Sequence, residues 1–68
     1  MGRTPRQIGV KLRSLRKGKG LSRYALAKTA RVSREYITKL EEGRSDPTIG
    51  MLQRLATALG VPVTALLE

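Results

Sequence analysis

The sequence contains no cysteine, no histidine, no tryptophan and no phenylalanine among its 68 residues. Without cysteine there can be no disulfide and no thiolate metal site. Without histidine there can be no Ser-His-Asp, Cys-His or histidine-zinc constellation. We therefore expect neither an enzyme nor a metal-binding or cofactor-binding protein.

Long apolar runs are also missing, and none approaches the roughly 18 residues that a membrane span requires. Met1 and Gly2 open the chain, but position 6 is arginine, so the myristoylation pattern fails. Gly18, Lys19 and Gly20 lack the other residues of a phosphate loop, and Gly20 is interpreted as a helix terminator. These absences predict a cytoplasmic protein that does not contact a membrane.

Acidic residues are few and unevenly placed. Five acidic side chains stand against 14 basic ones, which gives a formal charge of +9. All five acids lie at Glu35 or later, whereas the segment from Arg3 to Arg34 holds eleven of the bases. This imbalance predicts a polyanionic partner.

What is present predicts an all-α fold of five short helices around a single small core. Thr4, Pro5 and Gln7 form a capping box with proline at the first helical position, so a helix should begin there. A later helix should begin after Thr48 and end at Gly60, and a last one should cover residues 63–67. We expect residues 1–68 to form one domain, with residues 1–4 flexible.

Residues 22–43 predict two helices joined by a tight turn. Ser22 and Ser33 are suited to cap them, and Gly43 can adopt the left-handed conformation that ends a helix. Ala27 is small enough to let two steeply crossing helices approach closely. This arrangement is the helix-turn-helix, which presents its second helix to the major groove of DNA.

The spacing of these residues resembles the Xre family of helix-turn-helix proteins, which includes phage repressors and Cro proteins. The resemblance runs in one register from Ile8 to Leu67. The matching positions are Leu12, Leu15, Arg16, Gly20, Leu21, Ser22, Leu26, Ala27, Val32, Ser33, Ile37, Leu40, Glu41, Gly43, Pro47, Leu52, Leu55, Ala56, Leu59, Gly60, Val61, Leu66 and Leu67. It implies a compact, lambda-repressor-like five-helix bundle. Two positions depart from the family pattern: Arg23 replaces a common glutamine, and Arg31 replaces the glycine of the turn.

With Ile37 and Leu40 turned to the core, the second helix leaves polar side chains outside near its N-terminus. The resemblance implies that they read base edges. The candidates are Ser33, Arg34, Glu35, Thr38 and Lys39. The arginine fork suits guanine, and Glu35 could accept from cytosine or orient its neighbour. The alternative is that this face is only solvated.

A ring of polar residues around that helix is expected to hold DNA phosphates. Its candidates are Arg23, Tyr36, Arg44, Ser45 and Arg6, the last forming a mobile arm with Arg3. Tyr36 could instead pack its ring on the turn. Other bases are assigned to solubility and long-range steering, namely Lys11, Lys17, Lys28 and Arg54.

Two further sets of residues are expected to be structural. The resemblance implies a partly buried ion pair between Arg16 and Glu41, and an exposed pair is the alternative. The apolar residues at the C-terminus are expected to form a homodimer contact, or else to close the core. They are Val61, Val63, Leu66 and Leu67.

The resemblance implies a sequence-specific regulator of bacterial or phage transcription, acting at the nucleoid. A dimeric repressor that binds double-stranded DNA at a pseudo-palindromic operator fits best. The alternatives are an antitoxin with a toxin as partner, a restriction-modification controller, or an adaptor that binds another protein and has weak DNA affinity. RNA recognition is disfavoured because two tyrosines cannot build a stacking platform.

Overall fold

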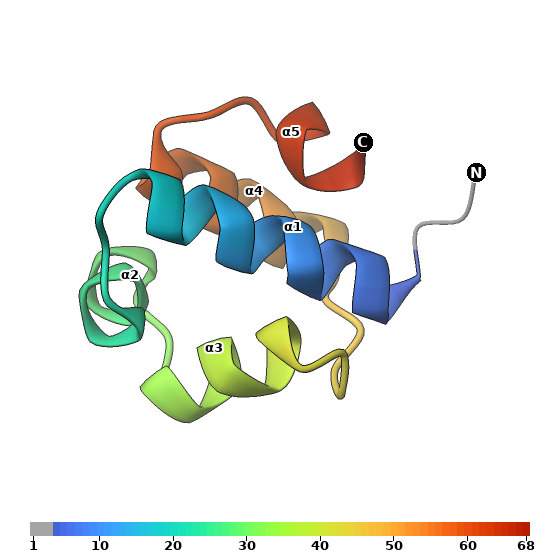
Figure 1. Ribbon diagram of the computed structural model, residues 1–68, viewed down its shortest axis with the longest axis horizontal. Helices are drawn as coiled ribbons and strands as arrows, with labels where there is room; N and C mark the ends of the chain where they lie inside the picture. Colours follow the sequence, from blue (N-terminus) through green and yellow to red (C-terminus); the bar gives the residue numbers. More distant parts are fainter. Residues whose placement is uncertain (1–3) are drawn as a thin grey trace.

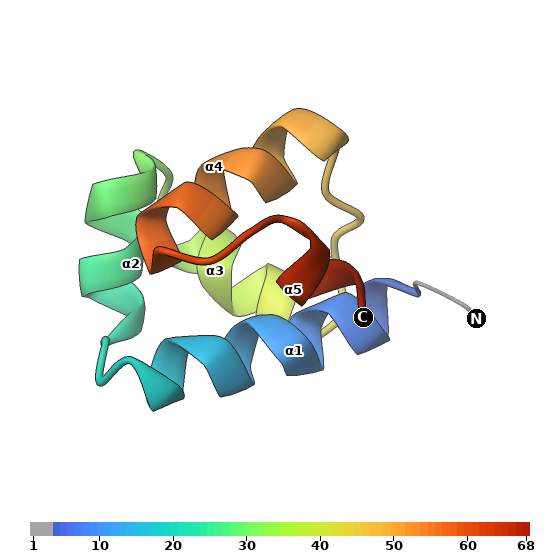
Figure 2. The ribbon, with the colours of Figure 1, turned by 90° about the horizontal axis from the view of Figure 1, so that it is seen from above.

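The computed structural model describes residues 4–68, which form five helices and no strand. The helices are α1 (Pro5–Gly18), α2 (Arg23–Ala30), α3 (Arg34–Glu41), α4 (Ile49–Leu59) and α5 (Thr64–Leu67). Figure 1 shows α1 and α4 in the middle of the molecule, with α3 on one side and α5 on the other. The view from above in Figure 2 agrees, because α5 lies in front of α1 and α4 while α3 lies behind them. The predicted all-α, five-helix fold is confirmed.

The helices begin where the predicted caps lie. Hydroxyl oxygens of Thr4, Ser22, Ser33 and Thr48 each accept a hydrogen bond from the backbone amide three residues later, at 3.0 to 3.1 Å. At the first of these caps the Gln7 side chain also accepts from the Thr4 amide, which completes the capping box. The four caps therefore satisfy backbone donors that the first helical turns leave free.

The N-terminal expectations need two corrections. Thr4 was expected at the end of a flexible segment, but it is fixed by its capping box, and the other residues of that segment lie outside the described ones. Arg6 was expected in a mobile arm, but it belongs to the first turn of α1, where proline and the capping box favour helix. Its supposed companion, Arg3, lies outside the described residues.

The core lies between α1 and α4 and draws on every helix. Its buried residues are Ile8, Leu12, Leu26, Ala27, Ala30, Ile37, Leu40, Leu52, Leu55, Ala56, Leu59 and Leu66. In α1 to α4 they recur at intervals of three and four, so one stripe of each of these helices faces inward, and α5 contributes Leu66 alone. α3 packs against both α1 and α2, and this double support holds it at the edge of the molecule.

One glycine allows α1 and α3 to approach closely. Gly9 is buried in the middle of α1, and a Cβ atom placed there would lie 2.2 Å from the Leu40 carbonyl oxygen and 2.9 Å from that of Glu41. Only a residue without a side chain fits between these backbones. Glycine at this position therefore sets the distance between α3 and its support.

Candidate nucleic-acid interface

α3 exposes the side chains that were predicted to read bases. Arg34, Glu35 and Lys39 are exposed, whereas Ile37 and Leu40 on the opposite face are fully buried. Thr38 is half-buried, and its hydroxyl donates to the Arg34 carbonyl oxygen at 3.2 Å. The outward face of α3, which we call the reading face, is formed by Arg34, Glu35, Thr38 and Lys39. It thus carries two cations and one carboxylate around the first two turns of the helix.

Within residues 4–68, the side chains of Arg34 and Glu35 form no ion pair and no hydrogen bond, although the backbone carbonyl of Arg34 accepts from the Thr38 hydroxyl. The suggestion that Glu35 orients Arg34 therefore finds no contact in this structure. Ser33 differs from them, because its hydroxyl already caps α3 by accepting from the Tyr36 amide. Both charged groups keep their hydrogen-bonding capacity for a ligand.

A hollow of about 400 Å³ lies beside the start of α3. Its lining comes from α2, the turn and α3, and consists of Tyr24, Ala27, Lys28, Val32, Ser33, Arg34 and Glu35. Tyr24 is 61% exposed here, and it was not among the residues predicted from the sequence. The signal was its position in the first turn of α2, away from the buried Leu26 and Ala27. An aromatic ring with a hydroxyl thus borders the reading face.

Beneath this face, three charged side chains form one cluster. The Arg16 guanidinium donates from Nε to Glu41 Oε2 at 2.6 Å and from Nη2 to Oε1 at 3.1 Å. Its Nη1 donates to the Leu21 carbonyl oxygen at 2.8 Å. The two side chains are only 8% and 1% exposed, so the predicted pair of Arg16 and Glu41 is confirmed as buried and the exposed alternative is wrong.

Arg23 is the third member of this cluster, which the sequence did not predict. Its Nε donates to Glu41 Oε1 at 3.0 Å, and its side chain is about one-third exposed. Burial alone would raise the pKa of Glu41, but hydrogen bonds from Arg16 and Arg23 and their positive charges outweigh it and lower that pKa. Only the Nε atom of Arg23 contacts Glu41. The two terminal nitrogens of its guanidinium, Nη1 and Nη2, make no hydrogen bond to the described residues.

The turn between α2 and α3 leaves the helical conformation at Arg31, the residue that replaces the glycine of the family pattern. This residue has φ 62° and ψ 47°, the left-handed conformation that costs a non-glycine residue roughly 1 kcal/mol. Arg54 of α4 was expected to serve solubility and steering, and this was wrong in part. Its Nη2 donates to the carbonyl oxygens of Ala30 and Arg31, both at 2.8 Å.

The loop after α3 lies against the start of α1. A Cβ atom at Gly43 would come within 3.0 Å of the Arg6 Cα, so Arg6 lies next to this loop. Arg44 pairs with Glu42 at 2.8 Å, and both side chains are about half exposed. Ser45 is half-buried, and Tyr36 packs partly against the core. Four of the five phosphate candidates thus lie on α3, on the loop that follows it or beside that loop, and Arg23 lies at the start of α2.

The predicted C-terminal contact residues divide into two groups. Leu66 is 2% exposed and belongs to the core, so it cannot form a contact surface in the folded chain. Val61, Val63 and Leu67 pack against the core but remain partly exposed. Because α5 lies on the side of the molecule opposite α3 (Figure 1), a partner bound there would leave the reading face uncovered.

Residues 4–68 contain neither a membrane-spanning helix nor a cluster of metal ligands. No helix in this part of the chain is long and apolar enough to cross a bilayer. Within the same residues, no three acidic side chains are grouped so that they could hold a metal ion.

Comparison with known proteins identifies close relatives. A family model described as helix-turn-helix matches residues 12–66. The immunity repressor protein of Bacillus phage phi105 is 34% identical over 59 residues, which are 87% of this chain and 41% of that protein. The HTH-type transcriptional regulator DdrOP3 of Deinococcus deserti is 41% identical over 58 residues, 85% of this chain and 45% of that protein. The chain thus spans less than half the length of these two relatives.

Two solved structures resemble this chain over nearly their whole length. The restriction-modification controller protein C.AhdI from Aeromonas hydrophila has a TM-score of 0.89 and 34% identity, covering 91% of this chain and 94% of that one. The biofilm regulator SinR, solved in complex with DNA, has a TM-score of 0.85 and 34% identity, covering 90% of this chain and 98% of that one.

Proposed function

Because the chain belongs to the helix-turn-helix family whose model it matches over residues 12–66, we propose that it is a sequence-specific regulator of transcription that binds double-stranded DNA. The observation that carries the proposal is the likeness to SinR, a regulator solved in complex with DNA, at 34% identity over 98% of that chain. The exposed, unpaired side chains at the start of α3 and the charge of +9 support it.

In this proposal α3 enters the major groove with its N-terminal half. Arg34 donates both arms of its guanidinium to O6 and N7 of a guanine, and Glu35 accepts from a cytosine N4 amine. Lys39, one turn further along, contacts a base edge or a phosphate, and the Thr38 methyl meets a thymine methyl. Ser33 contributes at the edge of this surface.

Phosphates are held by the residues that surround α3. Arg23 uses its free terminal nitrogens at the start of α2, where the helix dipole also favours an anion. Arg44 and Ser45, on the loop after α3, contact the phosphates of one DNA strand. Arg6, which lies beside this loop, and the Tyr36 hydroxyl contact phosphates of the same strand. The ion pair between Arg44 and Glu42 must open, or turn one donor outward, for this contact.

The regulator is proposed to act as a homodimer on a pseudo-palindromic operator and to repress by occupying it. One recognition helix reads too few base pairs to be selective in a genome, and two helices about 34 Å apart read successive turns. The partly exposed Val61, Val63 and Leu67 are the proposed contact. The site of action is then the bacterial nucleoid, in the cytoplasm.

A second candidate is a controller of restriction-modification genes. C.AhdI supports it, because the likeness extends over 94% of that protein at 34% identity. Both candidates bind operator DNA and differ in the genes they regulate. An antitoxin or a protein-binding adaptor has no specific observation in its favour.

Selection of bound fragments from random duplex DNA tests the proposal. We expect enrichment of one pseudo-palindrome with half-sites 10 to 10.5 base pairs apart. If each subunit neutralises about four phosphates, a plot of log affinity against log salt should have a slope near −7. Retention of all duplexes without enrichment would contradict sequence-specific binding and favour the adaptor.

A further inference from the structure

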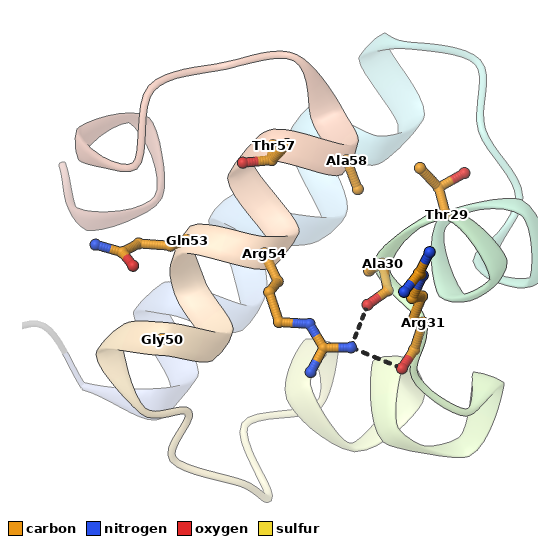
Figure 3. A pocket seen from close by; sticks show the side chains of 8 residues that line it. All are labelled: Thr29, Ala30, Arg31, Gly50, Gln53, Arg54, Thr57 and Ala58. Carbon is orange, nitrogen blue, oxygen red and sulfur yellow. Dashed lines mark hydrogen bonds between the residues drawn. The ribbon is translucent and has the colours of Figure 1, made fainter.

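Arg54 joins α4 to the end of α2, although it lies outside the residues that face DNA in the proposed complex. Figure 3 shows its guanidinium reaching from α4 to the carbonyl oxygens of Ala30 and Arg31, which accept from one nitrogen, Nη2. Carbonyl groups in the last turn of a helix lack intrahelical partners and form the negative end of the helix dipole. A guanidinium satisfies both the hydrogen-bonding and the charge requirement of this helix end.

The backbone that Arg54 holds is the strained part of the helix-turn-helix. Arg31 is the one non-glycine residue with positive φ among residues 4–68. Only Val32 and Ser33 separate it from the start of α3, and the Val32 amide donates back to the Ala27 carbonyl oxygen at 3.0 Å. A rotation at Arg31 would therefore change the direction in which α3 leaves the turn.

Arg54 belongs to a different surface from the reading face. It lines a hollow of about 360 Å³ between α2 and α4, which contains no residue of α3. The hollow beside Arg34 shares no residue with it. Both hollows flank the same turn, one on the α4 side and one on the α3 side.

We propose that Arg54 is a positioning residue for DNA recognition, which fixes the angle of α3 by clamping the carbonyl groups of Ala30 and Arg31. The inference rests on the proposed function, because it assumes that the start of α3 reads bases. Arg54 touches no base in this account. It acts through the turn, and its loss lets α3 occupy several orientations, of which only one fits the groove.

The test compares Arg54→Met with Arg13→Met. Arg13 is an exposed arginine of α1 whose side chain makes no hydrogen bond or ion pair to residues 4–68, so both variants lose the same charge and gain the same side chain. Affinities are measured for the selected operator and for a scrambled duplex over a range of salt. Arg54→Met should lower the ratio of operator affinity to scrambled-duplex affinity about tenfold, which is the effect expected from the loss of one base contact.

Arg13→Met should weaken binding to both duplexes equally and leave that ratio unchanged. Arg54→Lys keeps a donor and a positive charge at the carbonyl groups, and should restore most of the ratio. Equal ratios in Arg54→Met and Arg13→Met would overturn the proposal. A salt slope lower by about one unit in Arg54→Met than in Arg13→Met would also overturn it, by making Arg54 a phosphate ligand.

Amide hydrogen exchange of the DNA-free protein tests the clamp separately from the proposed function. The Val32 amide should exchange faster in Arg54→Met than in the wild type, and Arg13→Met should leave its exchange unchanged. Unchanged exchange in Arg54→Met would overturn the clamp even if the wild type reads sequence. A wild type without sequence preference would overturn the proposed function, whatever the exchange shows. If Arg54→Met does not fold, Arg54→Lys and Arg13→Lys replace the pair, with a smaller shift expected in the same direction.

Discussion

Replacement of Gly9 by alanine should destabilise the protein, although alanine is the better helix former. The added Cβ atom would lie 2.2 Å from the Leu40 carbonyl oxygen, and at 2.9 and 3.0 Å from the oxygen and carbon of the Glu41 carbonyl group. These are backbone atoms of α3, which cannot rotate away. To relieve the contact, α3 must move away from α1 by at least about 1.2 Å, the difference between 2.2 Å and the 3.4 Å at which ordinary van der Waals contact begins.

The expected magnitude follows from two opposing effects. Overpacking of a core costs about 1 to 3 kcal/mol, and contact with backbone on two sides places this case near the upper end. Helix propensity returns up to about 1 kcal/mol. The free energy of unfolding should therefore fall by about 2 kcal/mol, a large part of what a chain of this size possesses.

Gly18→Ala is the matched control, because Gly18 is the last residue of α1 and a Cβ atom there would meet nothing within 4 Å. It should leave stability unchanged or raise it by up to about 1 kcal/mol. Urea unfolding followed by circular dichroism at a helical wavelength measures both variants. A Gly9→Ala variant as stable as Gly18→Ala would refute the close approach of α1 and α3.

Three further predictions concern charge, strain and assembly. Because its pKa is lowered in the folded state, Glu41 stabilises the fold above the unfolded-state pKa of about 4.3, and this contribution should be lost as the pH falls through the lower folded-state pKa. Urea titrations should show that this loss is smaller in Glu41→Gln, which at neutral pH should be about 3 kcal/mol or more less stable. Arg31→Gly should raise the free energy of unfolding by up to about 1 kcal/mol by removing the cost of positive φ, and a lowered value would argue against strain there. Leu67→Glu should weaken self-association in sedimentation experiments, and unchanged association would exclude the C-terminal contact.

The sequence predicts those features of the fold that depend on neighbours three or four residues apart. Caps at Thr4, Ser22, Ser33 and Thr48 were all predictable, because each hydroxyl bonds an amide in its own first turn. The buried stripes of α1 to α4 follow from the same short-range periodicity. The order of the helices and the exposed face of α3 can also be predicted from these short-range patterns.

Contacts between distant segments were the part that the sequence did not predict. Arg54 bonds carbonyl groups 23 and 24 positions away, and a backbone carbonyl carries no sequence signal. The bond from Arg23 to Glu41 spans 18 positions, and the steric need for Gly9 arises from the backbone of another helix. Glycine in a helix suggests weakness by propensity alone, whereas here it permits close packing.

The most direct test of the account measures how well Arg34→Ala discriminates between the selected operator and a scrambled duplex at moderate salt. We expect the preference for the operator to fall by about 1 to 3 kcal/mol, while affinity for the scrambled duplex changes little. Equal loss of affinity for both duplexes, or a wild type that prefers neither, would contradict the claim that the start of α3 reads base sequence.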